Sequence, residues 1–283
     1  YDPELRRSVA IKILRPDREQ DRLKVAKFRR EAQITGGLEH PNIIPIYDMG
    51  QLSDGAFYFI MRRVTGRSFS DLIKDRKSYV EKRGIPHDPT LFLSSFLKIC
   101  DAIAFAHSRG VIHRDLKPSN VMVGSFGEVL VMDWGIAKRS EGEEEMTSDS
   151  GEGAPGLEAA SEDALQTLDG TVLGTPAYMP PEQAAGRIGS IDRRSDIYCL
   201  GVILYELLTL ERAYLGESTL EVFSQIMDGD FLPPSQRSSR SAVPRELDAV
   251  VLKAMAHEPS DRYRSVPDLQ ADIEAFLAGH TLS

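Results

Sequence analysis

The stretch His113-Arg-Asp-Leu-Lys-Pro-Ser-Asn120 decides how this 283-residue chain folds. It places the carboxylate of Asp115 five positions before the amide of Asn120, in a polar loop between a helical pattern and a strand pattern. Asp133, in Asp133-Trp-Gly135, follows thirteen residues later, directly after a second strand pattern. A lone Asp and Asn at this spacing are common by chance, but the full string followed by a second Asp is not. The combination predicts one site assembled from both segments.

The residue types in these two segments suit phosphoryl transfer. A carboxylate can orient an attacking hydroxyl group and accept its proton, and carboxylate and amide oxygens are ligands that Mg²⁺ accepts. Asp115, Asn120 and Asp133 supply these groups. The set therefore indicates phosphotransfer chemistry.

The N-terminal part of the chain alternates strand and helix patterns. β-Branched and apolar residues alternate over 8–14, and the charged stretch 21–36 runs into a glycine pair typical of a helix end. Two further strand patterns cover 43–47 and 56–64. Gly66 then interrupts the pattern, which predicts a small sheet with one helix up to residue 64.

The rest of the chain is predicted to be mainly helical. Apolar residues recur at helical spacing over 91–108, two short strand patterns cover 121–123 and 129–132, and helix patterns follow Pro180. The polar stretch 73–89 is predicted to be a loop. The sequence shows no internal repeat, so we expect a single domain over 1–283.

Composition and cysteine content indicate an ordinary globular protein, with 41% apolar and 27% charged residues. Cys100 and Cys199 lie in apolar helical patterns, so we expect reduced core residues and a cytosolic compartment. The most apolar stretch, 197–210, is shorter than the roughly 20 residues of a membrane-spanning helix and contains Glu206. We expect it to be a buried core helix.

The net charge of −9 comes from one segment. Residues 140–170 hold ten acidic residues and no Lys or Arg, which leaves a charge of +1 on the rest of the chain. This segment is rich in Glu, Ser, Gly and Ala, so it cannot bury enough apolar surface to offset its ordering entropy, and we expect it to be mobile. Without a basic face, nothing in the sequence indicates a nucleic-acid partner.

Further motifs accompany the central string in a fixed order along the chain. They are Val9-Ala-Ile-Lys12, Glu31 on the next helical stretch, Gly174-Thr-Pro-Ala-Tyr-Met-Pro-Pro-Glu182, Ser195-Asp-Ile-Tyr-Cys-Leu-Gly201 and His257-Glu-Pro-Ser-Asp-Arg262. With them, nearly the whole chain resembles the eukaryotic-like (Hanks-type) bacterial serine/threonine protein kinase domains. The resemblance implies a bilobal α+β protein-kinase fold, with a small β-sheet-plus-helix N-lobe (1–64) and a larger, mainly helical C-lobe (65–283).

The resemblance also implies catalytic roles. Lys12 would hold the α- and β-phosphates of ATP and would pair with Glu31. Asp115 would be the catalytic base, and Lys117 would steady the γ-phosphate. Lys117, two residues after Asp115, and Thr175, directly after Gly174, favour Ser and Thr over Tyr as acceptors.

The same resemblance implies the cofactors and their ligands. Asn120 and Asp133 would hold Mg²⁺, or Mn²⁺ in its place, and Ala10 would touch the adenine of ATP. The hinge that meets adenine is expected to include Met61, Arg63 and Val64. Two structural roles are implied as well, because Asp196 would brace the central loop and Arg262 would pair with Glu182.

Two features depart from the family pattern. The eleven residues before Lys12 contain no glycine, although a Gly-rich loop that covers ATP belongs there. We interpret the chain as a piece of a longer protein, truncated within its N-lobe, whose own activity could be poor. Trp134 replaces the usual Phe; we expect it to pack beside His113, and its indole N–H needs a partner.

Residues 133–182 form the expected activation segment, which contains the acidic stretch 140–170. Thr167 and Thr171 are the predicted regulatory phosphorylation sites, by their position relative to Gly174. Arg114 is the cation with which a phosphothreonine could pair. The alternative is that the acidic stretch is an inert insertion.

We therefore predict a kinase that transfers the γ-phosphoryl group of ATP to Ser and Thr hydroxyl groups of proteins, including its own activation segment. One alternative is a pseudokinase that acts as a nucleotide-binding signalling scaffold. It would be preferred if any of the four residues that carry the chemistry were missing (Lys12, Asp115, Asn120 or Asp133). Another is a small-molecule kinase of related fold, but such enzymes lack the peptide-docking segment 174–182.

The expected partners are protein substrates and, for phosphorylation in trans, a second copy of the chain in a homodimer. We expect no nucleic-acid partner and no membrane contact within this chain. The expected location is cytoplasmic, as the kinase domain of a longer protein that could itself be anchored in a membrane.

Overall fold

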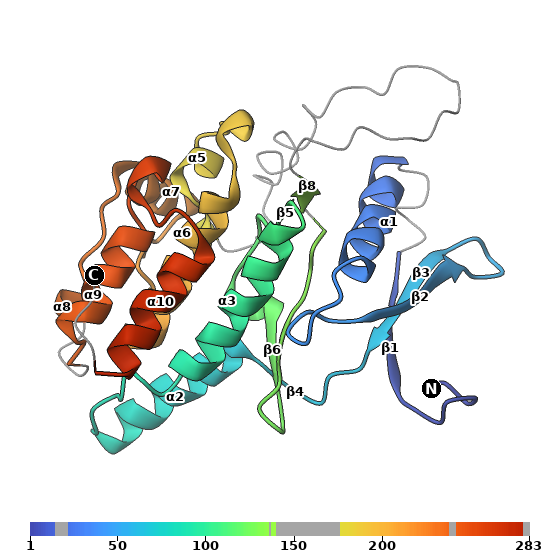
Figure 1. The fold of residues 1–283 in the computed structure, drawn as a ribbon, viewed down its shortest axis with the longest axis horizontal. Coiled ribbons are helices and arrows are strands. Elements are labelled where there is room, and N and C mark those ends of the chain that lie inside the picture. Colours follow the sequence, from blue (N-terminus) through green and yellow to red (C-terminus); the bar gives the residue numbers. More distant parts are fainter. Residues whose placement is uncertain (15–21, 136, 140–175, 238–241, 280–283) are drawn as a thin grey trace.

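The computed structural model of the protein describes residues 1–14, 22–135, 137–139, 176–237 and 242–279. Helix α1 and three strands make a small lobe, and a larger lobe is mainly helical (Figure 1). The predicted bilobal α+β architecture is confirmed. Segments 140–170 and 174–175, together with the expected phosphorylation sites Thr167 and Thr171, lie outside the described residues.

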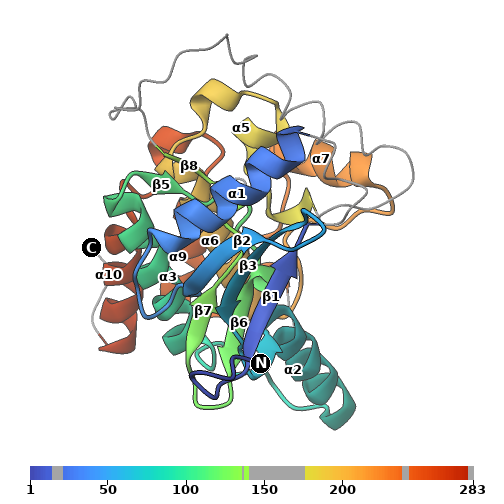
Figure 2. The same cartoon turned by 90° about the vertical axis from the view of Figure 1, so that its right-hand side faces the viewer.

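The small lobe is an antiparallel sheet packed against one helix. Strands β1 (Val9–Ile13), β3 (Phe57–Arg62) and β2 (Ile46–Gln51) lie in the order β1-β3-β2. Helix α1 (Arg22–Gly36) crosses this sheet in Figure 2. Its contact with the sheet is apolar and is formed by Leu14, Phe28, Ala32 and Phe59.

The strand predicted over 43–47 is only partly right. Ile43 and Ile44 are buried and join the small lobe to the larger one, since Ile44 N–H donates to the Val131 carbonyl at 3.1 Å. Pro45 has no N–H to offer a sheet ladder, so regular pairing with β3 begins after it, at Ile46. This short buried link fixes where the lobes meet.

The larger lobe begins with a small sheet and two helices. Strands β4 (Gly66–Ser68), β6 (Val121–Gly124) and β7 (Val129–Val131) pair in that order, and β5 (Val111–Ile112) pairs with β8 (Lys138–Arg139). Helix α3 (Leu93–Ser108) lies where the apolar pattern predicts a helix, with Phe96, Ile99, Ile103 and Ala106 fully buried. The loop of interest, 113–120, runs from β5 to β6 and ends in a 3₁₀ turn, Pro118–Asn120.

The prediction of a loop over 73–89 is wrong. Helix α2 (Phe69–Arg83) occupies most of it, capped by the Ser68 hydroxyl, which accepts from the Asp71 N–H, and closed by Gly84 at φ +61°. Only Phe69, Ile73 and Val80 are buried along it. The many charged residues between them hid this narrow apolar stripe.

The second half of the larger lobe is built around one buried helix. Helix α6 (Arg193–Thr209) contains most of the apolar stretch 197–210 and lies inside the lobe, as predicted. Gly201 lets it approach α9 closely, because a Cβ there would lie 2.8 Å from the Ala254 Cβ. The surrounding helices are α5 (Pro181–Ala184), α7 (Thr219–Asp228), α8 (Pro234–Arg237), α9 (Arg245–Ala254) and α10 (Val266–Leu277).

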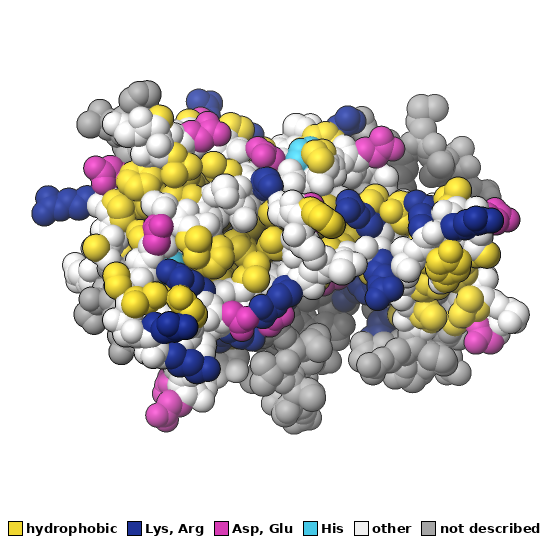
Figure 3. All heavy atoms as spheres, turned by 90° about the horizontal axis from the view of Figure 1, so that it is seen from below, with side chains coloured by type: hydrophobic (Ala, Val, Ile, Leu, Met, Phe, Trp, Pro, Cys, Tyr) yellow, Lys and Arg dark blue, Asp and Glu magenta, His cyan; other side chains and the backbone are white. Residues whose placement is uncertain are grey.

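The outer surface is mixed in character. Seen from below, apolar side chains gather on the larger lobe, and Lys and Arg side chains lie near the junction of the lobes (Figure 3). Within the ranges described above, no helix has the length and apolar character that crossing a membrane requires. Cys100 and Cys199 are free thiols buried in the core, as predicted.

A buried histidine links α2, α3 and α6. His87, in the connection between α2 and α3, donates from Nε2 to the Leu207 carbonyl at 2.8 Å and accepts at Nδ1 from Arg76 Nε at 3.4 Å. The contact at Nδ1 requires the neutral ring with its proton on Nε2, because a protonated ring has no acceptor nitrogen. Burial lowers the pKa of His87 below its ordinary value of 6.5, and the Arg76 charge lowers it further, against the effect of the Leu207 hydrogen bond.

We predict that acidification destabilises the domain through His87. Because its pKa is lower folded than unfolded, the stability it confers is complete above pH 6.5 and is lost as pH falls below that value. Urea unfolding at pH 7.5 and 5.5 should show a smaller loss of stability in His87→Gln, which keeps a donor for Leu207 but does not titrate. Equal losses in both proteins would contradict this assignment.

Candidate active site

The backbone of the loop 113–120 is held by a buried carboxylate from another helix. Asp196, in the first turn of α6, accepts from the N–H groups of His113 at 2.8 Å and Arg114 at 2.9 Å. Arg114 has φ +68°, a left-handed conformation that is unfavourable for a residue with a Cβ. The predicted bracing of the loop by Asp196 is confirmed.

Asp196 stays ionised despite being fully buried. Burial alone would raise its pKa, but the hydrogen bond from the His107 side chain and the bonds from the loop hold that pKa below its ordinary value. A buried charge is tolerated only where hydrogen bonds replace its water. The ionised state of the carboxylate therefore depends on the N–H donors around it, and the positions of the two loop N–H groups depend on the carboxylate.

Within the loop, two side chains position the Asp115 carboxylate. Lys117 Nζ lies 2.9 and 2.8 Å from its two oxygens. Asn120 Nδ2 donates to the Asp115 carbonyl at 2.8 Å and to its carboxylate at 3.1 Å. Because these bonds use both Nδ2 hydrogens, the Asn120 Oδ1 is the atom left to meet a cation.

Asp133 follows β7 and lies beside this loop. The Met132 N–H donates to the Asn120 carbonyl at 2.8 Å, so the two predicted magnesium ligands, Asn120 and Asp133, come from adjoining strands of backbone. Asp133 has φ +60°, again left-handed, and its side chain is about half exposed. This conformation turns its carboxylate out of β7 toward the small lobe.

The small lobe supplies a lysine to the same place. Lys12 Nζ, on β1, lies 2.6 Å from Glu31 Oε1 on α1 and 3.3 Å from Asp133 Oδ1. Burial would lower the pKa of Lys12, but the two carboxylates raise it above its ordinary value, so the ammonium stays charged. Gly135 leaves room for the Glu31 side chain beside Asp133, because a Cβ at position 135 would lie 3.1 Å from Glu31 Oε2.

Two of the four residues predicted to contact adenine share one face of the small sheet. Ala10 and Met61 are paired across β1 and β3, and Lys12 lies on the same face two residues on. Arg63 and Val64 directly follow β3, in the segment that leads into the larger lobe. Before β1, residues 1–8 contain no glycine, and the Asp2 N–H donates to the Arg7 carbonyl at 2.9 Å.

Trp134 packs as expected but its indole N–H is not satisfied. The ring is fully buried, with its centroid 4.6 Å from that of His113. Trp134 Nε1 has no hydrogen-bond acceptor among the described residues. His113 in turn bonds the Met132 carbonyl through Nε2 at 3.1 Å, so the ring pair connects the loop to the Asp133 segment.

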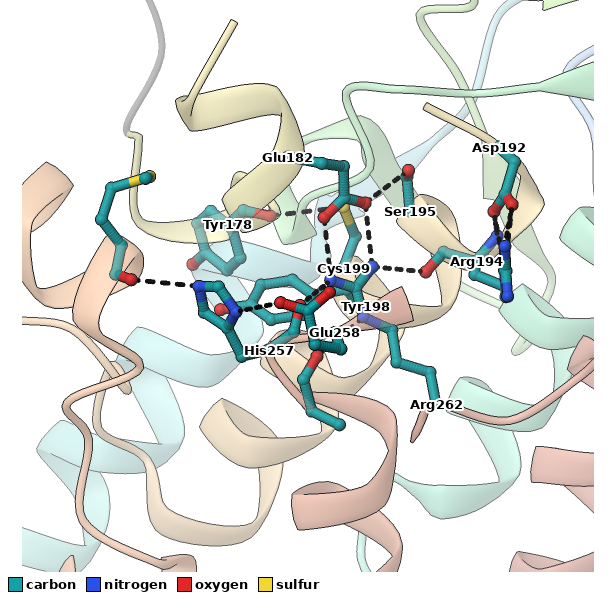
Figure 4. Close-up of polar contacts among 12 residues, drawn as sticks. Tyr178, Glu182, Asp192, Arg194, Ser195, Tyr198, Cys199, His257, Glu258 and Arg262 are labelled. Atoms are coloured by element: carbon teal, nitrogen blue, oxygen red, sulfur yellow. Dashed lines mark hydrogen bonds and ion pairs between the residues drawn. The ribbon is translucent and has the colours of Figure 1, made fainter. Parts of the chain in front are cut away.

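The segment after residue 175 is anchored by a buried ion pair (Figure 4). Arg262 Nη1 and Nη2 lie 2.9 and 2.8 Å from the two carboxylate oxygens of Glu182, as predicted, and Ser195 adds a hydrogen bond to Glu182 at 2.6 Å. Arg262 uses its other three N–H groups on the carbonyls of Arg194, Ala256 and His257. All five guanidinium donors are therefore satisfied.

The pair also accounts for the ionisation of Glu182. Burial alone would raise its pKa, but the hydrogen bonds from Arg262 and Ser195 hold that pKa below its ordinary value. Nearby, Tyr178 lies with its carbonyl accepting from the Cys199 thiol on α6. These contacts hold the described part of the predicted docking segment, from Pro176 onward, against the core of the larger lobe.

Sequence reasoning missed one residue of this site. His107, on α3, lies 2.8 Å from Asp196 Oδ2 and is nearly buried. The signal was available, because His107 falls four positions after Ile103 and eight after Ile99, on the same buried helical stripe. A polar side chain on an apolar stripe requires a partner.

The charged groups that converge here suit a nucleotide held through a metal ion. Among the residues whose placement is described, no group of three or more His, Cys, Asp and Glu could hold a metal ion by itself. Mg²⁺ in phosphotransferases needs only one or two protein carboxylates, with phosphates and water as the other ligands. Asp133 and the free Oδ1 of Asn120 fit that donor set.

Comparison with known proteins gives a family and several relatives. The sequence matches the protein kinase domain family over residues 2–271. It is 38% identical to the serine/threonine-protein kinase PknD of Chlamydia caviae, over 99% of this chain and 29% of that protein. It is 37% identical to the serine/threonine-protein kinase PknB of Mycobacterium leprae, over 98% of this chain and 40% of that protein. The chain thus spans well under half the length of these relatives.

We predict that the Arg262–Glu182 pair is a major contributor to stability. Arg262→Met keeps most of the side-chain volume but leaves the Glu182 carboxylate buried and unpaired, which should cost roughly 3–5 kcal/mol of unfolding free energy. The matched control is Arg194→Met, which breaks the more exposed Arg194–Asp192 pair and should cost about 1 kcal/mol or less. Urea denaturation measures both. Similar losses in the two variants would contradict the prediction.

Proposed function

Because the chain belongs to the protein kinase domain family, we propose that it transfers the γ-phosphoryl group of ATP to serine and threonine hydroxyl groups of proteins. The observation that carries the proposal is the convergence of Lys12, Asp115, Asn120 and Asp133 from both lobes on one site. The similarity to serine/threonine-protein kinases over nearly the whole chain supports the same reaction.

Asp115 is proposed as the group that receives the acceptor hydroxyl. Its carboxylate is held by Lys117 and Asn120, so it can accept a hydrogen bond from the hydroxyl and take its proton as the bond to phosphorus forms. The Lys117 ammonium beside it would offset negative charge on the transferred group. Positioning of this kind is the main contribution that a protein makes to phosphoryl transfer.

The remaining charged groups are proposed to hold the nucleotide. Lys12, fixed by Glu31, would meet the α- and β-phosphates, and Asn120 and Asp133 would hold the metal. Bound Mg²⁺ would neutralise charge on the phosphate oxygens. Ala10, Met61, Arg63 and Val64 line the stretch where adenine would lie.

Protein rather than small-molecule acceptors are favoured by the segment around Pro176–Tyr178. This segment is held on α6 by the Cys199–Tyr178 contact. Through Glu182 it is also tied to Arg262, in the connection between α9 and α10. Such an anchored surface suits an extended peptide as acceptor. A pseudokinase role is not supported, since the four charged and amide groups are all present and the relatives are serine/threonine-protein kinases.

We further propose that the chain phosphorylates its own activation segment, with Thr167 and Thr171 as acceptors. A homodimer would allow this transfer in trans, and a cytoplasmic location would give access to ATP.

Phosphorylation should depend on both carboxylates of the site. With Mg·ATP, the intact mass of the wild-type chain should rise by whole phosphates, mapped to peptides with Thr167 and Thr171. Asp115→Asn and Asp133→Asn should each slow the transfer by roughly 10²–10⁴-fold. Asp101→Asn, on the exposed surface of α3, is the control and should behave as wild type. Equal labelling of Asp133→Asn and wild type would exclude the proposed site.

Nucleotide binding can be separated from catalysis. Mg·ATP should raise the unfolding temperature of the wild-type chain and of Asp115→Asn, because Asp115 faces the acceptor and not the nucleotide. The rise should be much smaller in Lys12→Met and Asp133→Asn, and should disappear when Mg²⁺ is removed with EDTA. No rise in the wild-type chain would contradict the proposed ATP site.

A further inference from the structure

We propose that the outer face of helix α1 is the docking site for the acidic segment 140–170 of the same chain. The contact pairs carboxylates of that segment with exposed cations on the helix that carries Glu31. The contact itself needs no phosphoryl transfer, so it goes beyond the proposed function. Only its effect on the reaction rests on that function.

Helix α1 carries a one-sided charge. Its 15 residues include five Lys and Arg residues and one acidic residue, Glu31. Glu31 does not offset the cations, because it points to the active site and lies 2.6 Å from Lys12 Nζ. Four of the cations are exposed and make up what we call the basic face of α1: Arg22, Lys27, Arg29 and Arg30.

Three of these four cations have no acidic partner among the described residues. None of the ion pairs between those residues includes Arg22, Arg29 or Arg30. Lys27 and Arg30 are three positions apart, so they are neighbours on the helix surface and repel each other. A binding partner that brings negative charge would remove this repulsion.

The basic face of α1 also approaches a cation of the larger lobe. Burial lowers the pKa of Arg114 below its ordinary value, and the Arg30 charge lowers it further, against the effect of Asp196. Two like charges from the two lobes therefore lie near each other. Carboxylates bound at this end of the basic face offset repulsion between the lobes as well as within α1.

The acidic segment begins within reach of the basic face. The last described residue before it is Arg139, which ends β8, and β8 lies near α1 in both ribbon views (Figure 1, Figure 2). The next six residues span about 20 Å when extended, and α1, with 15 residues, is about 22 Å long. The carboxylates nearest to β8 can therefore reach most of the helix. They are Glu141, Glu143, Glu144 and Glu145.

Charge and attachment together favour this occupant. Segment 140–170 holds ten acidic residues and no Lys or Arg, and the rest of the chain carries a charge of +1. Because the segment is attached to β8, its effective concentration at α1 is roughly millimolar. Single exposed ion pairs are weak, but several of them in one network stabilise a contact that is already held close.

Docking on the basic face stabilises the position of α1 in the proposed active site. The inner side of α1 rests on the small sheet through a small apolar cluster, in which the helix supplies Phe28 and Ala32. The same helix holds Lys12 through Glu31. A contact on the outer side makes separation of α1 from the sheet less favourable. The acidic segment thus favours the state in which Lys12 and Glu31 are paired.

The test measures hydrogen exchange of the α1 amides in the full chain with Asp115→Asn, the parent protein here. By the proposed function this parent cannot phosphorylate itself, so carboxylates alone are compared. The helix variant adds Lys27→Gln and Arg30→Gln, and a combined variant carries both sets of changes. The segment variant adds four changes: Glu141→Gln, Glu143→Gln, Glu144→Gln and Glu145→Gln.

At low salt, the α1 amides should exchange about 5–30-fold faster in the segment variant and in the helix variant than in the parent. The combined variant should exchange no faster than the faster of the two, because both sets of changes remove the same contact. In about 1 M NaCl, charges are screened within about 3 Å. The parent should then exchange as fast as the variants, and the variants should change little.

The matched control removes two exposed cations of the larger lobe, with Arg187→Gln and Arg245→Gln, and its α1 exchange should match that of the parent. Charge reversal adds a second test. Lys27→Glu with Arg30→Glu should exchange fast, and the further changes Glu143→Lys and Glu144→Lys should return α1 exchange to within a few-fold of the parent. If the reversed helix does not fold, the Gln variants decide alone.

Three results bear on the proposal from the other side. Parent-like exchange in the segment variant, or additive acceleration in the combined variant, would overturn it. Protection of α1 that increases with protein concentration would assign the acidic segment to a second copy and overturn the contact within one chain. Absence of any transfer by the wild-type chain with Mg·ATP would instead count against the proposed function, while hydrogen exchange would still decide the docking.

Discussion

The Asp196 carboxylate is the contact on which the rest of the site depends. A charge with no exposure to water is costly unless hydrogen bonds replace its hydration, and here they come from His107, His113 and Arg114. Those bonds hold a strained turn directly before Asp115. The long apolar helix α6 serves this purpose, because it carries the carboxylate into the middle of the lobe and keeps it there by packing on α9.

Both lobes contribute residues to the site, which lies where they meet. The larger lobe supplies Asp115, Asn120 and Asp133, and the small lobe supplies Lys12, which is held by Glu31 and reaches Asp133. The buried link at Ile43 and Ile44 ties the small lobe to β7, only two residues before Asp133. The distance between the lysine and the loop therefore depends on how the lobes sit on each other, and the chain reinforces that junction with main-chain hydrogen bonds.

The features predictable from sequence were those written in local patterns or in the family motifs. Period-two and helical spacing indicated β1, α1 and α3, and the motif order indicated the Arg262–Glu182 and Asp196 contacts. Helix α2 was missed because its buried face is narrow, with three apolar residues among many charges. Apolar β-branched residues such as Ile43 and Ile44 suit either a strand or a buried connection, and only the following Pro45 distinguishes the two. His107 was missed because its partner lies 89 positions away. The catalytic and binding roles of the site residues stay predictions from the sequence. So do the predictions for segment 140–175, which lies outside the described residues.

Trp134 has a consequence for how this protein can be observed. It is the single tryptophan of the chain, so all indole fluorescence comes from one point, directly after Asp133. The ring is fully buried against His113, and its N–H lacks an acceptor in the described part of the structure. Indole emission moves to longer wavelength when the ring meets water or gains a polar partner. The intrinsic fluorescence of Trp134 therefore reports on its surroundings where the lobes meet. Movement of the Asp133 segment can be followed by that fluorescence without attaching a label.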